Sequence, residues 1–140
     1  LSLTAFSNLL RSTNPNAGPA LGNAVLSNAV APGGTVTVAN ADVIVLSSAH
    51  QYANAADVAK ALTTAATSIN FATAQTNAVN HYVLAYQDLT GNTRFADMDI
   101  HNAAAFTNTA SVATLAVSDM VQLIGVDLTQ IQASNIQFIA

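Results

Sequence analysis

Hydrophobic and polar positions change their spacing along the chain, and these changes divide it into a helical start and a β-rich remainder. An apolar stripe at helical spacing runs through residues 3–11, and a second runs from Pro19 to Val30. Pro32-Gly33-Gly34 interrupts the helical pattern, because neither residue type readily continues a helix. We therefore expect one domain of residues 1–140, in which residues 1–34 form a helical arm or cap and residues 35–140 form a β-rich body.

The body opens with two short segments whose pattern is typical of strands. Thr35–Val38 alternates polar and apolar residues, as a half-buried strand does. Val43–Leu46 is a continuous apolar run that is rich in β-branched residues, which favours a buried strand. Asn40-Ala41-Asp42 separates them and has the composition of a turn. The pattern predicts a β-hairpin over these residues.

Helical spacing returns at residues 55–70, where Val58, Leu62 and Ile69 share one face with several alanines. Asn54 is placed to cap this helix, and Asp57 lies in the first turn, where the helix dipole favours an acidic residue. The sequence therefore predicts one central, alanine-rich helix.

The clearest hairpin pattern follows. Tyr82–Tyr86 and Thr93–Ile100 predict two strands joined by a turn at residues 88–92, where Gly91 can adopt a positive φ. Further strands are expected at residues 111–117, 119–124 and 135–139, with a short helix or turn at residues 128–133. The predicted fold is α+β and β-dominated, with N-terminal helices and an antiparallel sheet around one central helix.

Composition adds that the surface is polar but carries little charge. Only 7% of the residues are charged, whereas about 25% is usual for a soluble domain. Three basic residues are too few to bind a nucleic-acid backbone or an anionic membrane surface. No apolar run approaches the ~20 residues that span a bilayer, so we expect no membrane span. The lack of cysteine excludes disulfides and thiolate metal sites.

Acidic residues cluster at the second predicted hairpin and suggest a cation site. Asp97 and Asp99 project from one face of the return strand, while Asp88 and Asn92 flank the turn. Calcium takes about 6–8 oxygen ligands of these types, so the four residues form a candidate calcium site, and we expect no other cofactor. The alternative is a solvated strand face that discourages edge pairing. The three histidines lie too far apart in sequence to indicate a zinc site.

Two tyrosines on the first strand of this hairpin form a second candidate site. Tyr82 and Tyr86 share a strand face and are surrounded by amide residues, which suits stacking on a carbohydrate. The alternative is that both rings pack within the protein. The chain has no glutamate, no cysteine and no Gly-x-Ser-x-Gly motif to present a nucleophile, so we do not expect an enzyme.

Three segments resemble a known group of proteins. These segments are Asn80-His81-Tyr82-Val83-Leu84, Gly91-Asn92-Thr93-Arg94-Phe95-Ala96-Asp97 and Asp119-Met120-Val121-Gln122-Leu123-Ile124-Gly125-Val126-Asp127-Leu128. Together they resemble the C-terminal region of large bacterial type I secreted surface proteins, including surface-layer and calcium-repeat adhesins. The resemblance covers residues 43–140. The chain lacks the glycine-rich calcium nonapeptides of that group.

The resemblance implies export through a C-terminal signal and an extracellular location at the bacterial surface. The chain starts without the basic and apolar segments of an N-terminal secretory signal, which agrees with this route. We expect a non-catalytic structural or interaction module of a secreted surface or matrix protein, which associates with itself into a layer, a fibre or a larger assembly. The alternative is a calcium- or glycan-binding terminal module of a type I secreted adhesin.

Overall fold

The computed structural model describes residues 22–23, 26, 36–38, 43–63, 69–71, 79–101, 109–110 and 115–138. Strands make up more than half of these residues, and one α-helix accompanies them. The prediction of a β-dominated α+β fold is thereby confirmed in its coarse form. The first predicted helix, at residues 3–11, lies outside the described residues.

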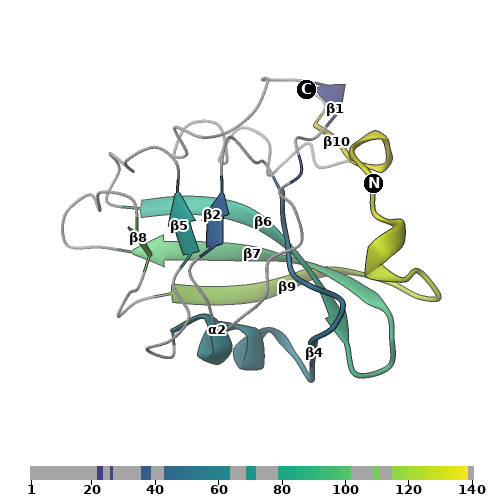
Figure 1. Cartoon of the computed structure of the whole chain (residues 1–140), viewed down its shortest axis with the longest axis horizontal. Coiled ribbons are helices and arrows are strands. Elements are labelled where there is room, and N and C mark those ends of the chain that lie inside the picture. Colours follow the sequence, from purple (N-terminus) through teal and green to yellow (C-terminus); the bar gives the residue numbers. More distant parts are fainter. Residues whose placement is uncertain are drawn as a thin grey trace.

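A five-stranded mixed sheet forms the centre of the fold (Figure 1). Its strands are β3 (Val43–Val45), β4 (Gln51–Tyr52), β6 (Val79–Asp88), β7 (Thr93–His101) and β9 (Leu115–Leu123). β6 and β7 form the predicted antiparallel hairpin, in register from Val79 opposite His101 to Gln87 opposite Thr93. β9 continues the sheet antiparallel to β7, while β3 and β4 both run parallel to β6 on its other side.

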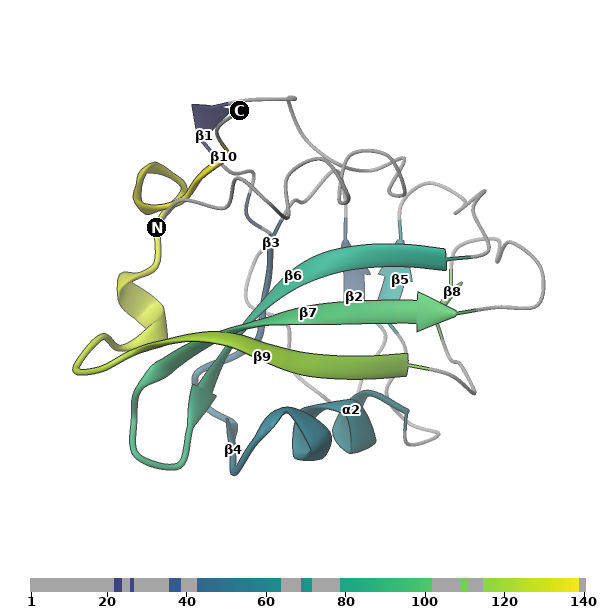
Figure 2. The same ribbon diagram turned by 180° about the vertical axis from the view of Figure 1, so that it is seen from behind.

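Two small sheets lie beside the central one (Figure 2). In the first, β5 (Ile69–Phe71) pairs in parallel with β2 (Val36–Val38) and antiparallel with β8 (Thr109–Ala110). In the second, β1 (Gly22–Asn23) pairs antiparallel with β10 (Gln137–Phe138). This last pairing brings the early part of the chain next to its end.

Both faces of the central sheet are buried, each against a different part of the chain. The face toward the helix α2 (Ala55–Thr63) packs Val58 and Leu62 against a group of sheet residues: Ile44, Leu46, Tyr82, Leu84, Tyr86, Ala96, Met98 and Ile100. The opposite face packs Val43, Val45, Val83, Ala85 and Phe95 against the C-terminal residues Leu128 and Ile136. The run Tyr82–Tyr86 is apolar throughout because a central strand buried on both faces has no polar side.

Helix α2 begins as predicted and ends earlier. Asn54 Oδ1 accepts a hydrogen bond from the Asp57 backbone N–H at 3.0 Å, which is the expected N-terminal cap. The helix stops at Thr63, and Ile69–Phe71 is strand β5, so the predicted extent of residues 55–70 is too long.

Three other predictions about elements are wrong. Residues 35–38 and 43–46 do not form a hairpin, because β2 and β3 belong to different sheets and each pairs in parallel with a distant strand. The helix predicted at residues 19–30 gives way to strand β1, whose Gly22 is a poor helix former. The two strands expected within residues 111–124 are one strand, β9, which carries a bulge at Met120 opposite Phe95 and Ala96.

The C-terminal residues form two 3-10 helices that cover one end of the sheet. The first, η1 (Leu128–Gln130), occupies the first half of residues 128–133, where a short helix or turn was predicted, and the second, η2 (Ala133–Asn135), precedes the buried Ile136. Within the part of the chain described here, no helix has the length and apolar character that crossing a membrane requires.

Candidate functional site

The turn between β6 and β7 is organised by one buried carboxylate. Asp88 Oδ1 accepts hydrogen bonds from the backbone N–H groups of Thr90 and Asn92, at 2.9 and 3.1 Å, and from the Thr90 hydroxyl at 2.6 Å. Its other oxygen, Oδ2, accepts from Arg94 Nε at 3.0 Å and from Gln122 Nε2 at 2.8 Å. These five donors saturate the carboxylate, whose side chain is only 4% exposed.

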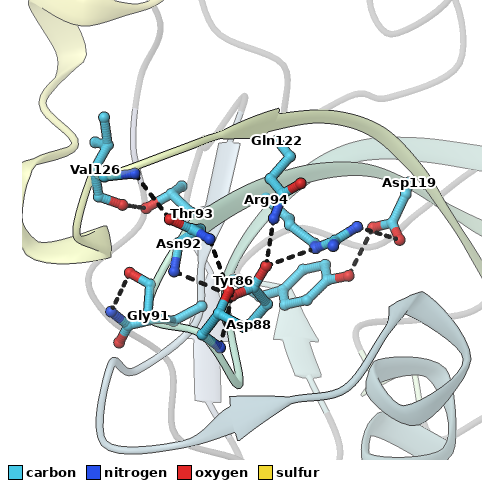
Figure 3. A network of polar contacts seen from close by, with 12 residues as sticks. Tyr86, Asp88, Gly91, Asn92, Thr93, Arg94, Asp119, Gln122 and Val126 are labelled. Carbon is cyan, nitrogen blue, oxygen red and sulfur yellow. Dashed lines mark hydrogen bonds and ion pairs between the residues drawn. The ribbon is translucent and has the colours of Figure 1, made fainter.

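Arg94 links this turn to the edge strand (Figure 3). Its Nε lies 3.0 Å from Asp88 Oδ2, and its Nη1 lies 3.3 Å from Asp119 Oδ2 on β9. The other oxygen of Asp119 accepts a 2.6 Å hydrogen bond from the hydroxyl of Tyr86. One guanidinium therefore bridges two carboxylates, and a buried tyrosine completes the network across three strands.

The network shifts the acidity of its members. Burial opposes the charged form of Asp88, but the hydrogen bonds from Thr90, Arg94 and Asn92 outweigh it and hold the pKa of Asp88 well below its usual range. Burial, followed by the hydrogen bond to Asp119, raises the pKa of Tyr86 far above that of a free tyrosine. Asp88 is thus charged and Tyr86 neutral at ordinary pH, so neither is poised to exchange a proton.

A second tyrosine lies against the first. The rings of Tyr52 and Tyr86 meet edge to face, with centroids 5.9 Å apart. Burial raises the pKa of Tyr52 to about 12. Among the residues that the structure describes, the Tyr52 hydroxyl is buried with no hydrogen-bond partner. This hydroxyl lowers the stability of the fold, because burial removes its hydrogen bonds to water and no protein hydrogen bond replaces them.

On the other face of the hairpin, a second set of polar contacts fastens the C-terminal segment. Gln87 Nε2 donates to the Gly91 carbonyl and to Asp127 Oδ2, both at 3.0 Å. Asp127 also caps η1 through its other oxygen, which accepts from the Thr129 backbone N–H at 2.8 Å and from the Thr129 hydroxyl at 2.6 Å. The hydrogen bonds from Thr129 and Gln87 lower the pKa of Asp127.

A separate group of titratable residues lies further along the same face. His81 Nδ1 is 3.0 Å from Asp97 Oδ1, and His81 Nε2 is 3.8 Å from Asp99 Oδ1. The two carboxylates thus approach different nitrogens of the imidazole ring. Within the described residues, no three histidine or acidic side chains form a group that could hold a metal ion.

The structure separates the residues predicted to bind calcium. Asp88 lies at the turn and points to the face of Tyr86, where it contacts Arg94 and Gln122. Asp97 and Asp99 lie on the opposite face and contact His81. Asn92 uses its Oδ1 to accept a hydrogen bond from the Gly125 backbone N–H at 2.8 Å. The four residues therefore do not form one coordination sphere, and the oxygens of Asp88 are already occupied by donors.

The two tyrosines predicted to bind carbohydrate are both fully buried. Tyr82 and Tyr86 share a face as expected, but that face is the one covered by α2, and neither ring has exposed surface. A ring without exposed surface cannot stack on a sugar. The alternative stated from the sequence, that both rings pack within the protein, is what the structure shows.

A pocket opens where the C-terminal helices meet the end of the sheet. Its volume is about 410 Å³, and it is lined by Phe95, Leu123, Val126, Gln130, Ile131, Asn135 and Ile136. None of these residues is ionisable. The adjoining turn exposes Ile124, with 81% of its surface accessible, and the nearby hairpin turn exposes Leu89, with 64% accessible. The pocket could not be predicted from sequence patterns, because its lining comes from three separate parts of the chain: β7, β9 and the C-terminal turns.

No protein-family model, curated protein sequence or solved structure matches this chain. Its function is therefore inferred from its own residues and their arrangement.

Proposed function

We propose that the chain is a non-catalytic structural or interaction module of a secreted bacterial surface or extracellular matrix protein, and that it associates with itself. The observation that carries this proposal is the edge of β9. β9 is the last strand in the order β3-β6-β7-β9, and no strand among the described residues pairs with its outer side. A nine-residue edge presents a row of backbone donors and acceptors that a strand of another molecule can pair with.

The side chains of β9 support this role. Soluble proteins usually protect an edge with lysine, proline or an inward-pointing charge. β9 contains neither lysine nor proline, and its single charged residue, Asp119, points inward to Tyr86 and Arg94, so the preceding Leu115–Ser118 is the less protected part of this edge. The bulge at Met120 interrupts the regular edge, so pairing would use Leu115–Asp119. Low charge over the whole chain leaves little repulsion between copies.

The described polar groups also support a role without catalysis. Asp88, Asp119 and Asp127 each hold parts of the fold together through several hydrogen bonds. Extracellular location at the bacterial surface rests on the composition and on the resemblance of residues 43–140 to secreted surface proteins.

The mass of the intact chain in solution tests self-association. Light scattering after size exclusion, over a range of concentrations and in calcium or chelator, should give a mass that rises above 14.3 kDa in both buffers. The double variant Ala116→Lys/Ser118→Lys should reduce this mass, because it adds charge to two exposed edge positions. A mass of one chain at every concentration would overturn the proposal. A rise only in calcium would favour the calcium-binding alternative.

A further inference from the structure

Residues 126–138, which we call the C-terminal strap, cover one face of the central sheet with few buried side chains. Among residues 126–137, only Leu128 and Ile136 are buried. Both belong to the hydrophobic cluster on the face away from α2, and Ile131 packs against that cluster while partly exposed. The strap lies at one end of the sheet, outside its strands (Figure 2). Because buried apolar surface is what holds such an element in place, the strap is held weakly for its length.

A cavity lies between the strap and the sheet. Its volume is about 410 Å³, and five of its seven lining residues belong to the strap. The other two, Phe95 and Leu123, belong to β7 and β9. Atoms that face a cavity lack the van der Waals partners that a close-packed interface supplies. The contact between strap and sheet is therefore weaker than the packing of α2 on the other face would be with the same residues.

Several polar contacts of the strap are made within the strap itself. In η1, the Thr129 backbone N–H donates to Asp127 Oδ1 at 2.8 Å, and the Asp127 backbone N–H donates to Gln130 Oε1 at 3.0 Å. In η2, the Gln132 backbone N–H donates to Asn135 Oδ1 at 2.8 Å. These bonds do not depend on the sheet, so the two short helices can keep their shape when the strap moves.

The strap is fastened to the rest of the chain near each of its ends. At the first end, the Val126 carbonyl accepts from the backbone N–H and the hydroxyl of Thr93, and Gln87 Nε2 donates to Asp127 Oδ2. At the second end, β10 pairs with β1 over two residues. Gly125 precedes the strap with φ +74°, and a Cβ atom at this position would meet no atom within 4 Å. Gly125 thus has the conformational freedom and the space of a hinge.

We propose that the C-terminal strap opens as a unit about Gly125 while the central sheet and α2 stay folded. Opening breaks only the contacts of the strap, whereas global unfolding also breaks the cluster under α2, so opening costs less free energy. The open form exposes an apolar sheet face that the closed form hides, and this face consists of Val43, Val45, Val83, Ala85 and Phe95. The strap is therefore a built-in cover that controls access to this face.

Thiol labelling of two matched variants tests the opening, because the unmodified chain has no cysteine. Ala85 and Ala96 are both fully buried on neighbouring strands, but Ala85 belongs to the cluster that includes the strap and Ala96 to the cluster under α2. We expect the thiol of Ala85→Cys to react with DTNB on the order of a hundredfold faster than that of Ala96→Cys. The Ala85→Cys rate should hardly change in low urea, while the Ala96→Cys rate should follow global unfolding. Equal rates with the same urea dependence overturn the inference.

A second substitution in each cysteine variant distinguishes local opening from a general loss of stability. Leu62→Ala removes a buried contact of α2, so it should raise the Ala96→Cys rate by about thirtyfold or more and leave the Ala85→Cys rate unchanged. Ile136→Ala should raise both rates, because the contacts of the strap are lost in local opening and in global unfolding alike. If Leu62→Ala raises both rates equally, both thiols are exposed by the same unfolding event and the inference is overturned.

Discussion

At the scale of single residues, two tyrosines in edge-to-face contact are in opposite situations. The hydroxyl of Tyr86 donates to a carboxylate oxygen of Asp119 at 2.6 Å, whereas the hydroxyl of Tyr52 is buried without a partner among the described residues. Both rings belong to the same hydrophobic cluster under α2. The same substitution at the two positions should therefore have effects of opposite sign.

We predict that Tyr52→Phe stabilises the protein and Tyr86→Phe destabilises it. The Tyr52 hydroxyl is desolvated in the folded protein without forming a hydrogen bond. Its removal should therefore raise the free energy of unfolding by about 1 kcal/mol. Removing the Tyr86 hydroxyl breaks a hydrogen bond to a charged acceptor and should lower it by about 1.5 kcal/mol. Urea denaturation of both variants measures the two changes in the free energy of unfolding. A Tyr52→Phe variant as destabilised as Tyr86→Phe would show that the Tyr52 hydroxyl has a partner after all.

At the scale of elements, the β6–β7 hairpin depends on one carboxylate in its turn. Asp88 orders the backbone of residues 90 and 92 and pairs with Arg94, and through Arg94 it reaches Asp119 on β9. Gly91 has the positive φ of +81° that was predicted for it. The turn, the hairpin and the edge strand therefore share one polar connection.

We predict that Asp88→Asn lowers the free energy of unfolding at pH 7 by about 3 kcal/mol, because it removes the charge of the more buried of the two carboxylates that Arg94 bridges. Asp57→Asn, in the exposed first turn of α2, is the control and should cost less than about 1 kcal/mol. Urea denaturation of both variants measures these changes. A loss at Asp88 no larger than at Asp57 would contradict the assigned role.

The same residue sets the response to acid. The pKa of Asp88 is lower in the folded protein than its ordinary value of 3.8, so its contribution is fully present above that pH. The contribution is lost as the pH falls from about 4 toward the folded pKa. The free energy of unfolding should therefore decline steeply below about pH 4 in the unmodified chain and less steeply in Asp88→Asn. Parallel declines in the two proteins would rule Asp88 out as the source.

The local patterns in the sequence predicted contacts between neighbours and missed those between distant segments. The β6–β7 hairpin, its Gly91 turn and the Asn54 cap all depend on residues a few positions apart, and all are present. The parallel partners of β2 and β3 lie far along the chain, and a short apolar run does not specify its partner.

The candidate sites were misplaced for a related reason. Alternation along β6 predicted that Tyr82 and Tyr86 share a face, but it did not say that this face is covered. The apolar Val83 and Ala85 between them were the available sign of burial on both sides. Alternation likewise placed Asp97 and Asp99 together, but the hairpin register sets them opposite Val83 and His81, on the other face from Asp88, which follows Tyr82 and Tyr86 along β6.

At the scale of the whole molecule, the described structure has a fully buried central strand and more exposed edges and turns. β6 lies between parallel and antiparallel neighbours, with its five residues 82–86 fully buried. The turns at Leu89 and Ile124 are largely exposed, and the edge strand β9 is made of exposed and half-buried residues. Local opening of a protein takes place where few buried contacts must be broken.

Amide hydrogen exchange should follow this division. We predict that the amides of Tyr82–Tyr86 exchange only through global unfolding, so their protection should equal the free energy of unfolding measured in urea. The amide of Leu89 should exchange close to its intrinsic rate. If the amides of residues 82–86 exchange orders of magnitude faster than global unfolding allows, β6 is not the most stable part of the fold.

The parallel pairing of β3 with β6 sets the order in which the chain can fold. Pairing of Val43 with Val83 closes a long loop, which costs more chain entropy than closing the short turn between β6 and β7. The β6–β7 hairpin can therefore form earlier. The hairpin is thus the natural nucleus, and β3 and α2 add to a surface that already exists. In stopped-flow folding and unfolding experiments, destabilising substitutions in the hairpin should lower the folding rate constant. Destabilising substitutions in β3 should mainly raise the unfolding rate constant. During synthesis, the first half of the chain leaves the ribosome before β6 exists. The apolar strand β3 then has no partner strand to pair with until the second half follows.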